Sequence, residues 1–180
     1  DDLRAVSSCS WHSLSSVCRR FFPASASAAC VFMSVSRLVA WKRVNRNLYI
    51  LKELLQLGCT EFIYYVVGEG NQKPKLQELS NKLGLQNHVV FVGALHHANV
   101  IAYLINADIF LSMYDSSNVG NPLLEAIRAN TIVITLANGD TGKWIRHKKN
   151  GLIYDPKYLS FSIVDEAPFF ESEICFWITL

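Results

Sequence analysis

The sequence predicts an α/β fold in which a doubly wound, Rossmann-like parallel sheet carries helices on both faces. Two observations lead to this prediction. Short, continuously apolar segments recur between residues 29 and 156, and stretches with apolar residues at helical spacing separate them. A continuously apolar strand is buried on both faces, which is typical of a parallel sheet covered by helices. We therefore expect one domain over residues 29–156, with irregular segments at 1–28 and 157–180.

Length and composition agree with a single domain that has one hydrophobic core. The chain has 180 residues, of which 51% are hydrophobic and 18% charged, and this balance excludes a disordered chain. The formal net charge of +2 is too small for a dedicated nucleic-acid-binding protein, so we expect no nucleic-acid partner. The five cysteines are spread without a CxxC pair, which favours reduced thiols in the cytoplasm over a disulfide scaffold or a zinc ribbon.

The expected strands and helices alternate along the middle of the chain. Strands are expected at Val31–Val35, Phe62–Val67, His88–Val92, Ala107–Met113, Thr131–Leu136 and Gly151–Tyr154. Helices are expected around Leu48–Leu55, Leu76–Leu83, Val100–Ile105, Pro122–Ala129 and Thr141–His147. In the usual strand order, 3-2-1-4-5-6, the first and fourth strands are neighbours, and ligands bind beyond their carboxyl ends. The two loops that follow these strands are therefore the expected place for a site.

The loop after the first strand, Ser36–Lys42, is rich in positive charge. Arg37 and Lys42, followed by Arg43, offer cations that suit a phosphate-bearing ligand. A solvated basic loop without a ligand remains the alternative explanation for this cluster.

The loop after the fourth strand, Tyr114–Asn121, leads into a helix. Asn121 is a suitable N-cap and Pro122 a suitable first helical residue, so free N–H groups at this helix start can bind an anion. Gly120 allows a phosphate to approach the backbone closely. Glu125 stands four residues after the expected cap, a spacing that fits a capping box poorly. Favourable interaction with the helix dipole remains the alternative reason for an acid at this position.

Other motifs argue against a cofactor or a metal. Gly68 and Gly70 begin a GxG pattern, but Lys73 stands where the dinucleotide fingerprint has its third glycine. His96 and His97 are adjacent and have no cysteine or carboxylate at ligand spacing, which indicates loop or helix-start residues. We expect no bound cofactor and no metal.

Six segments in order resemble the C-terminal, nucleotide-sugar-binding domain of retaining glycosyltransferases with the GT-B architecture (family 4, group 1). The resemblance covers Ser34–Tyr154. Its segments are Ser36–Leu38 with Trp41-Lys42, Tyr65–Gly70, Val90–Gly93, Ala107–Ser112, Asn121–Ala126 and Asn150–Tyr154.

The resemblance implies roles for matching residues. Arg37, Lys42 and Glu125 take the catalytic positions: the two cations neutralise the donor diphosphate, and the acid binds the ribose hydroxyls. The implied donor-binding residues are Gly68, Gly70, Ser117, Asn118, Gly120 and Asn121. The chain departs from the family at Ser117, where the family has a glutamate that meets the donor sugar, and at Lys143, near another common acid.

The resemblance further implies glycosyl transfer from a nucleotide-sugar donor, retaining and metal-independent, in the cytoplasm or at a membrane as part of a larger enzyme. The family's acceptor-binding domain precedes Ser34, and 33 residues are too few to form it, so we expect this chain to be the donor-binding half and inactive alone. The acceptor is not defined. The alternative is a non-catalytic nucleotide-binding remnant or an interaction module. An epimerase of the same architecture fits less well, because suitably placed catalytic acids and histidines are not evident.

Overall fold

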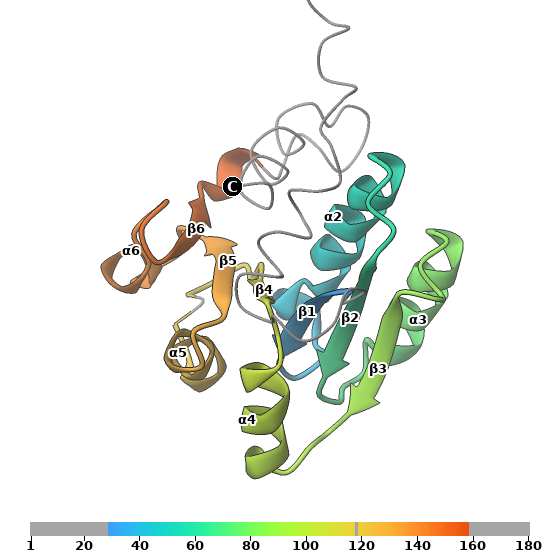
Figure 1. Cartoon of the computed structure of the whole chain (residues 1–180), viewed down its shortest axis with the longest axis horizontal. Helices are drawn as coiled ribbons and strands as arrows, with labels where there is room; N and C mark the ends of the chain where they lie inside the picture. The colour runs from blue at the N-terminus through green and yellow to red at the C-terminus, as the bar shows by residue number, and fades with distance from the viewer. Residues whose placement is uncertain (1–28, 118, 159–180) are drawn as a thin grey trace, which may run out of the picture. The chain divides into compact units, whose positions relative to one another are not determined.

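Six parallel strands form the sheet of the computed structural model, which describes residues 29–117 and 119–158 (Figure 1). The strand order is β3-β2-β1-β4-β5-β6, so the predicted fold class and strand order are confirmed. The strands are β1 (Cys30–Val35), β2 (Phe62–Val67), β3 (Val89–Gly93), β4 (Ile109–Ser112), β5 (Ile132–Leu136) and β6 (Gly151–Tyr154).

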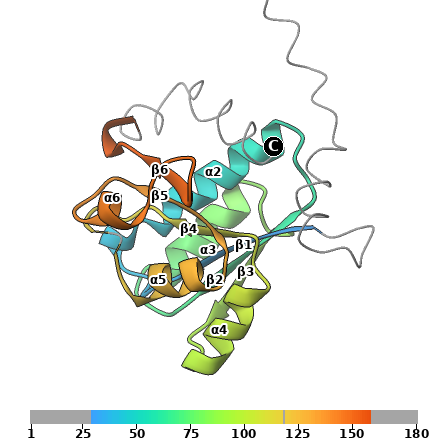
Figure 2. The same cartoon turned by 60° about the vertical axis from the view of Figure 1, so that its left-hand side comes forward.

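Helices cover both faces of this sheet. The helices are α2 (Val44–Gln56), α3 (Lys73–Lys82), α4 (His97–Ile105), α5 (Asn121–Arg128) and α6 (Thr141–Trp144), with short 3-10 turns η1 (Ala40–Lys42) and η2 (Pro156–Tyr158). α2 and α3 lie on one face, whereas α4 and α5 lie on the other (Figure 1, Figure 2). The helices change to the other face of the sheet at the connection from β3 to β4. This happens because β4, β5 and β6 are added on the opposite side of β1 from β2 and β3.

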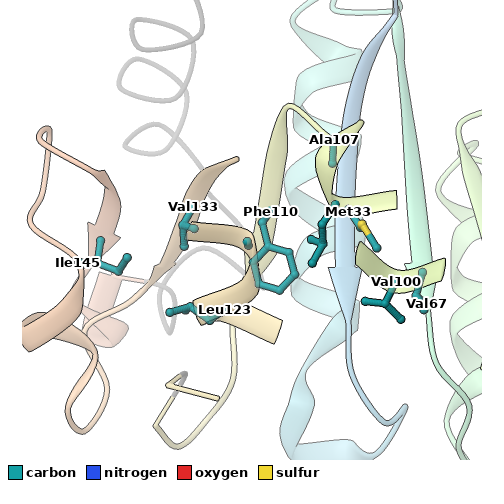
Figure 3. Close-up of a cluster of buried hydrophobic side chains, with 10 residues drawn as sticks. Met33, Val67, Val100, Ala107, Phe110, Leu123, Val133 and Ile145 are labelled. Carbon is teal, nitrogen blue, oxygen red and sulfur yellow. The ribbon is translucent and has the colours of Figure 1, made fainter. Parts of the chain in front are cut away.

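Both faces of the central strands are buried, as the apolar runs predicted. Phe32 and Met33 are consecutive residues of β1 and therefore point to opposite faces, yet they are 2% and 0% exposed. Figure 3 shows the cluster on the face of α4 and α5. Its buried members are Met33, Val67, Val100, Leu104, Ala107, Phe110, Leu123, Ala126, Val133 and Ile145.

Of the elements that are shorter than the sequence predicts, β4 and α6 fall short by the most residues. The β4 strand begins at Ile109 rather than Ala107, because the Ala107 N–H donates to Leu104 at the end of α4. α6 ends at Trp144 rather than His147. There the Asn150 side chain donates to the Trp144 carbonyl at 2.8 Å and accepts from the Arg146 N–H at 2.6 Å. These bonds close a loop where the periodicity alone suggested more helix.

A buried polar cluster fixes α2 under the sheet. The Tyr64 hydroxyl is hydrogen-bonded to the Ser34 hydroxyl, and the Asn47 amide donates to both oxygens, at 2.8 and 3.0 Å. Burial is the main cause that raises the pKa of Tyr64, so the phenol stays protonated. The cluster joins β1, β2 and α2 next to the loop that carries Arg37 and Lys42.

The structure follows the chain through η2 to residue 158, just beyond the expected domain boundary at 156. The segments expected to be irregular, 1–28 and most of 157–180, lie outside the described residues. Among the helices described, none is long and apolar enough to cross a membrane.

Candidate functional site

The loops after β1 and β4 meet at the carboxyl edge of the sheet, because these two strands pair with each other. The Asp115 N–H donates to the Trp41 carbonyl at 3.0 Å. The Asp115 carboxylate also contacts Arg43 Nε at 2.5 Å and Arg46 at 2.9 Å. Arg43 is therefore neutralised within the protein, whereas the sequence had grouped it with the cations available to a phosphate.

A pocket of about 220 Å³ lies between these two loops. It is lined by Val35, Ser36, Arg37, Trp41, Lys42, Tyr114, Ser117, Val119, Gly120, Pro122 and Leu123. Pockets that enclose a whole small ligand usually measure ~300–1,000 Å³. This pocket is therefore large enough for part of a nucleotide sugar, such as its diphosphate. The structure brings four predicted site residues to one place: Arg37, Lys42, Ser117 and Gly120.

Lys42 is held by two aromatic rings. Its Nζ lies 3.6 Å from the ring centroid of Tyr114 and 4.2 Å from that of Trp41, within the range of a cation–π interaction. The Tyr114 hydroxyl donates to the Val35 carbonyl at 3.2 Å, which anchors its ring at the end of β1. Burial, and secondarily the charge of Arg37, lower the pKa of Lys42 to about 8.

The two pocket cations, Arg37 and Lys42, form no ion pair within the part of the chain that the structure describes. Over residues 29–117 and 119–158, neither Arg37 nor Lys42 contacts a carboxylate. Arg37 is exposed, and Lys42 carries its positive charge at neutral pH because its pKa is about 8. The pocket therefore presents two positive charges that have no carboxylate counter-ion among the described residues.

The start of α5 completes the site. Gly120 is the N-cap and Asn121 the first helical residue, so the predicted cap at Asn121 was wrong by one position. The Leu123 and Leu124 N–H groups both donate to the Gly120 carbonyl at 3.1 Å. Pro122 has no N–H to offer. The N–H groups of Gly120 and Asn121 have no acceptor among the described residues, so they are available to an anion.

Glu125 lies outside the pocket lining. Its Oε1 is 2.9 Å from Nε2 of His97, the first residue of α4. The Glu125 side chain is 21% exposed and that of His97 is 70% exposed. The sequence indicated that His96 and His97 are loop or helix-start residues, and they are the N-cap and the first residue of α4, but the contact with Glu125 was not predicted. The available signal was that α4 and α5 share one face of the sheet and begin at the same edge.

Gly68 and Gly70 have a packing role that the sequence did not reveal. A Cβ atom at Gly68 would stand 1.9 Å from the Ser36 carbonyl oxygen, and one at Gly70 would stand 2.2 Å from that of Leu38. Both glycines therefore let the loop after β2 run directly against the backbone that carries Arg37. Neither lines the pocket described above, and their contact with a ligand stays a prediction.

Ser117, at the position where the resemblance implies a glutamate, lines the pocket. Its hydroxyl accepts the Val119 N–H at 3.3 Å, and its Cβ would be 2.9 Å from a Cβ atom added at Gly139. Asn118 lies outside the described residues. Lys143 pairs with Asp140 at 2.7 Å, and both side chains are exposed.

A doubly wound parallel sheet with a pocket at its switch point defines a Rossmann-like α/β domain, a class in which ligands bind beyond the carboxyl ends of the strands. The chain belongs to the family described as glycosyl transferases group 1, which matches residues 20–166. It is 32% identical over 119 residues to 2-deoxystreptamine N-acetyl-D-glucosaminyltransferase of Niallia circulans, covering 66% of this chain and 30% of that protein. It is 27% identical over 122 residues to alpha-monoglucosyldiacylglycerol synthase of Streptococcus pneumoniae, covering 68% and 27%. The chain thus spans about a third or less of these relatives' length.

Solved structures share the fold. The lipopolysaccharide outer core galactosyltransferase WaaB, in its apo form, superposes with a TM-score of 0.66 at 23% identity, over 76% of this chain and 39% of that one. Anabaena HepE in complex with UDP and glucose gives a TM-score of 0.65 at 20% identity, over 82% and 39%.

Proposed function

We propose that this chain is the donor-binding domain of a glycosyltransferase that uses a nucleoside diphosphate sugar, retains the anomeric configuration and requires no metal. The observation that carries the proposal is the pocket itself. It places Arg37 and Lys42 next to the available N–H groups at the start of α5. Family membership and the UDP complex of a protein with the same fold support a nucleotide-sugar donor.

The proposed chemistry is electrostatic stabilisation of the leaving group. When the sugar departs, negative charge develops on the diphosphate, and donors already in place stabilise that charge without reorganisation. Arg37 provides a forked set of donors, Lys42 a point charge and the N–H groups of Gly120 and Asn121 two aligned dipoles. Two cations can supply the charge that a divalent ion provides in other sites, which supports a metal-independent reaction.

The other two parts of the donor, its ribose and its sugar, are assigned to residues in α5 and in the loop before it. We assign the ribose hydroxyls to the Glu125 carboxylate and the donor sugar to Ser117 and Asn118. A serine hydroxyl can exchange hydrogen bonds with sugar hydroxyls, but it carries no charge to offer an oxocarbenium-like transition state. We further propose that a separate acceptor-binding domain belongs to the same, larger enzyme, which works in the cytoplasm or at its membrane.

Calorimetry and chemical-shift mapping on the full 180-residue chain test this proposal. Titration with UDP, GDP and pyrophosphate should give binding in the micromolar to millimolar range, with shifts at Arg37, Lys42 and Gly120. Binding should persist in EDTA. Lys75→Ala is the matched control, since Lys75 is an exposed lysine on α3, away from the pocket lining. Absence of shifts at these residues at millimolar ligand would overturn the proposal.

A further inference from the structure

The contact between His97 and Glu125 joins two helix starts at the ligand-binding edge of the sheet. α4 and α5 lie side by side on the same face (Figure 1, Figure 2), and the imidazole Nε2 lies 2.9 Å from the carboxylate Oε1. Within the part of the chain that the structure describes, the other carboxylate oxygen, Oε2, has no hydrogen-bond partner. One oxygen is held, and the other can accept from a ligand.

We propose that His97 is a positioning residue for Glu125, which it holds ready to accept a hydrogen bond from the ribose of the bound nucleotide. The inference rests on the proposed function, in which Glu125 binds the ribose hydroxyls. It adds a residue that neither the sequence patterns nor the family resemblance assigned.

The physical reason is pre-organisation. A glutamate side chain has several rotatable bonds, and their freedom is lost when its carboxylate binds a ligand. Each flexible side chain that is ordered on binding weakens association, so fixing it beforehand strengthens association. Glu125 is 21% exposed while His97 is 70% exposed. The more exposed histidine can therefore restrain the carboxylate without blocking a ligand's access to it.

The chemistry of the contact requires a donor at the imidazole. A carboxylate accepts hydrogen bonds only, so Nε2 carries the proton, in the neutral ring or in the imidazolium. A glutamine amide at this position can also donate at a similar reach, but it does not titrate. His97→Gln should therefore keep the restraint, and His97→Ala should remove it.

A purely structural link between α4 and α5 is the competing explanation. The two helices already pack through buried side chains, among them Val100, Leu104, Leu123 and Ala126. If the histidine only supported this packing, its removal would lower stability and affect all ligands alike. It would not change the preference for a ligand that carries the ribose hydroxyls.

Calorimetry on the full chain with UDP, 2′-deoxy-UDP and pyrophosphate separates the two explanations. His97→Ala should weaken UDP binding roughly two- to tenfold, reduce the preference for UDP over 2′-deoxy-UDP and leave pyrophosphate binding unchanged. His97→Gln should restore both UDP affinity and preference. His96→Ala is the matched control, because the His96 side chain makes no capping bond.

The outcomes distinguish this inference from the proposed function. If Glu125→Gln weakens UDP while His97→Ala does not, the ribose contact stands and the positioning role is wrong. If Glu125→Gln also leaves the UDP preference unchanged, the ribose contact itself fails and the inference fails with it. Equal weakening of UDP and pyrophosphate in His97→Ala, or failure of His97→Gln to restore binding, would overturn the positioning role.

Discussion

The Lys42 ammonium lies 3.6 Å from the ring centroid of Tyr114, a residue 72 positions further along the chain. The contact joins the loop after β1 to the end of β4. An aromatic face attracts a cation but does not neutralise it, as a carboxylate would. The lysine is thus held in place by the rings while its charge remains available to an anion.

Anion binding should weaken as the pH rises above about 8. Burial first, and then the Arg37 charge, lower the pKa of Lys42 from 10.5 to about 8. Below this pH the ammonium is charged and can bind a diphosphate; above it the neutral amine cannot. UDP affinity should therefore fall by up to about tenfold per pH unit between pH 8 and 9.5. Burial raises the pKa of Tyr114 as well, which keeps that phenol protonated over this range.

Calorimetry at fixed ionic strength checks this dependence, with Lys42→Ala as the reference. That variant should bind UDP weakly, and its affinity should vary little over the same interval. A wild-type affinity that stays constant to pH 9.5 would contradict a Lys42 contact with the diphosphate.

Glu125→Gln and Lys42→Ala should give a crossed pattern with two ligands. Loss of a charge-assisted hydrogen bond to ribose should weaken UDP binding by ~1.5–3 kcal/mol, roughly ten- to a hundredfold. Pyrophosphate has no ribose, so Glu125→Gln should leave its affinity unchanged. Lys42→Ala should weaken both ligands, because both carry the phosphates. Isothermal titration calorimetry of the two variants measures these affinities. If Glu125→Gln weakens the binding of both ligands equally, the variant has a folding defect instead.

Arg43 should be replaceable by glycine at a smaller cost than by alanine. It has φ 46° and ψ 38°, a left-handed conformation that costs other residues ~1–2 kcal/mol relative to glycine. Its ion pair with Asp115 joins side chains that are 46% and 34% exposed, and such pairs contribute roughly 0–1 kcal/mol. Arg43→Gly loses the pair but gains relief of the backbone. Arg43→Ala loses the pair and keeps the strain.

Urea denaturation measures the difference directly. We expect the free energy of unfolding of Arg43→Gly to exceed that of Arg43→Ala by about 1 kcal/mol. If the alanine variant is equally stable, the left-handed conformation is not imposed by the fold.

The fold could be predicted closely because its signals are local. Each strand is a short apolar run, and the helix between two strands fixes their parallel direction, so the order follows from the usual winding of such sheets. The predicted boundaries were wrong where hydrogen bonds outside the regular pattern limit an element, as the bond from the Ala107 N–H does at the start of β4. Asn150 stops α6 at Trp144 by bonding its carbonyl, and nothing in the apolar spacing reveals that bond.

The site was predictable in part for the same reason. Arg37, Lys42 and Gly120 follow directly from the carboxyl ends of adjacent strands, and the structure places all three in one pocket. The partners of these residues depend on packing between elements distant in the sequence. The Tyr114 ring at Lys42 and His97 at Glu125 are such partners. Spacing along the chain does not reveal them, although the expected topology already brings the starts of α4 and α5 to one edge of the sheet.

Gly68→Ala should destabilise the domain as a whole. The residue has φ 133°, and an added Cβ would stand 1.9 Å from the Ser36 carbonyl oxygen. Both the backbone conformation and this close approach exclude a side chain, and neither the strand nor the facing loop can shift without moving Arg37. We expect a loss of more than about 3 kcal/mol in the free energy of unfolding.

Gly84→Ala is the matched control for that variant. Gly84 also has a positive φ, 74°, but nothing lies within 4 Å of its added Cβ. Its replacement should cost only about 1 kcal/mol, the penalty of the left-handed conformation alone. Urea denaturation gives both free energies, and UDP titration shows what remains of the site. If Gly68→Ala folds as stably as Gly84→Ala yet no longer binds UDP, the role of Gly68 is to let a ligand approach the backbone. If the large loss of stability is found, the role of Gly68 is to allow close contact between the loops after β1 and β2. The site then depends on Gly68 because this contact positions Arg37.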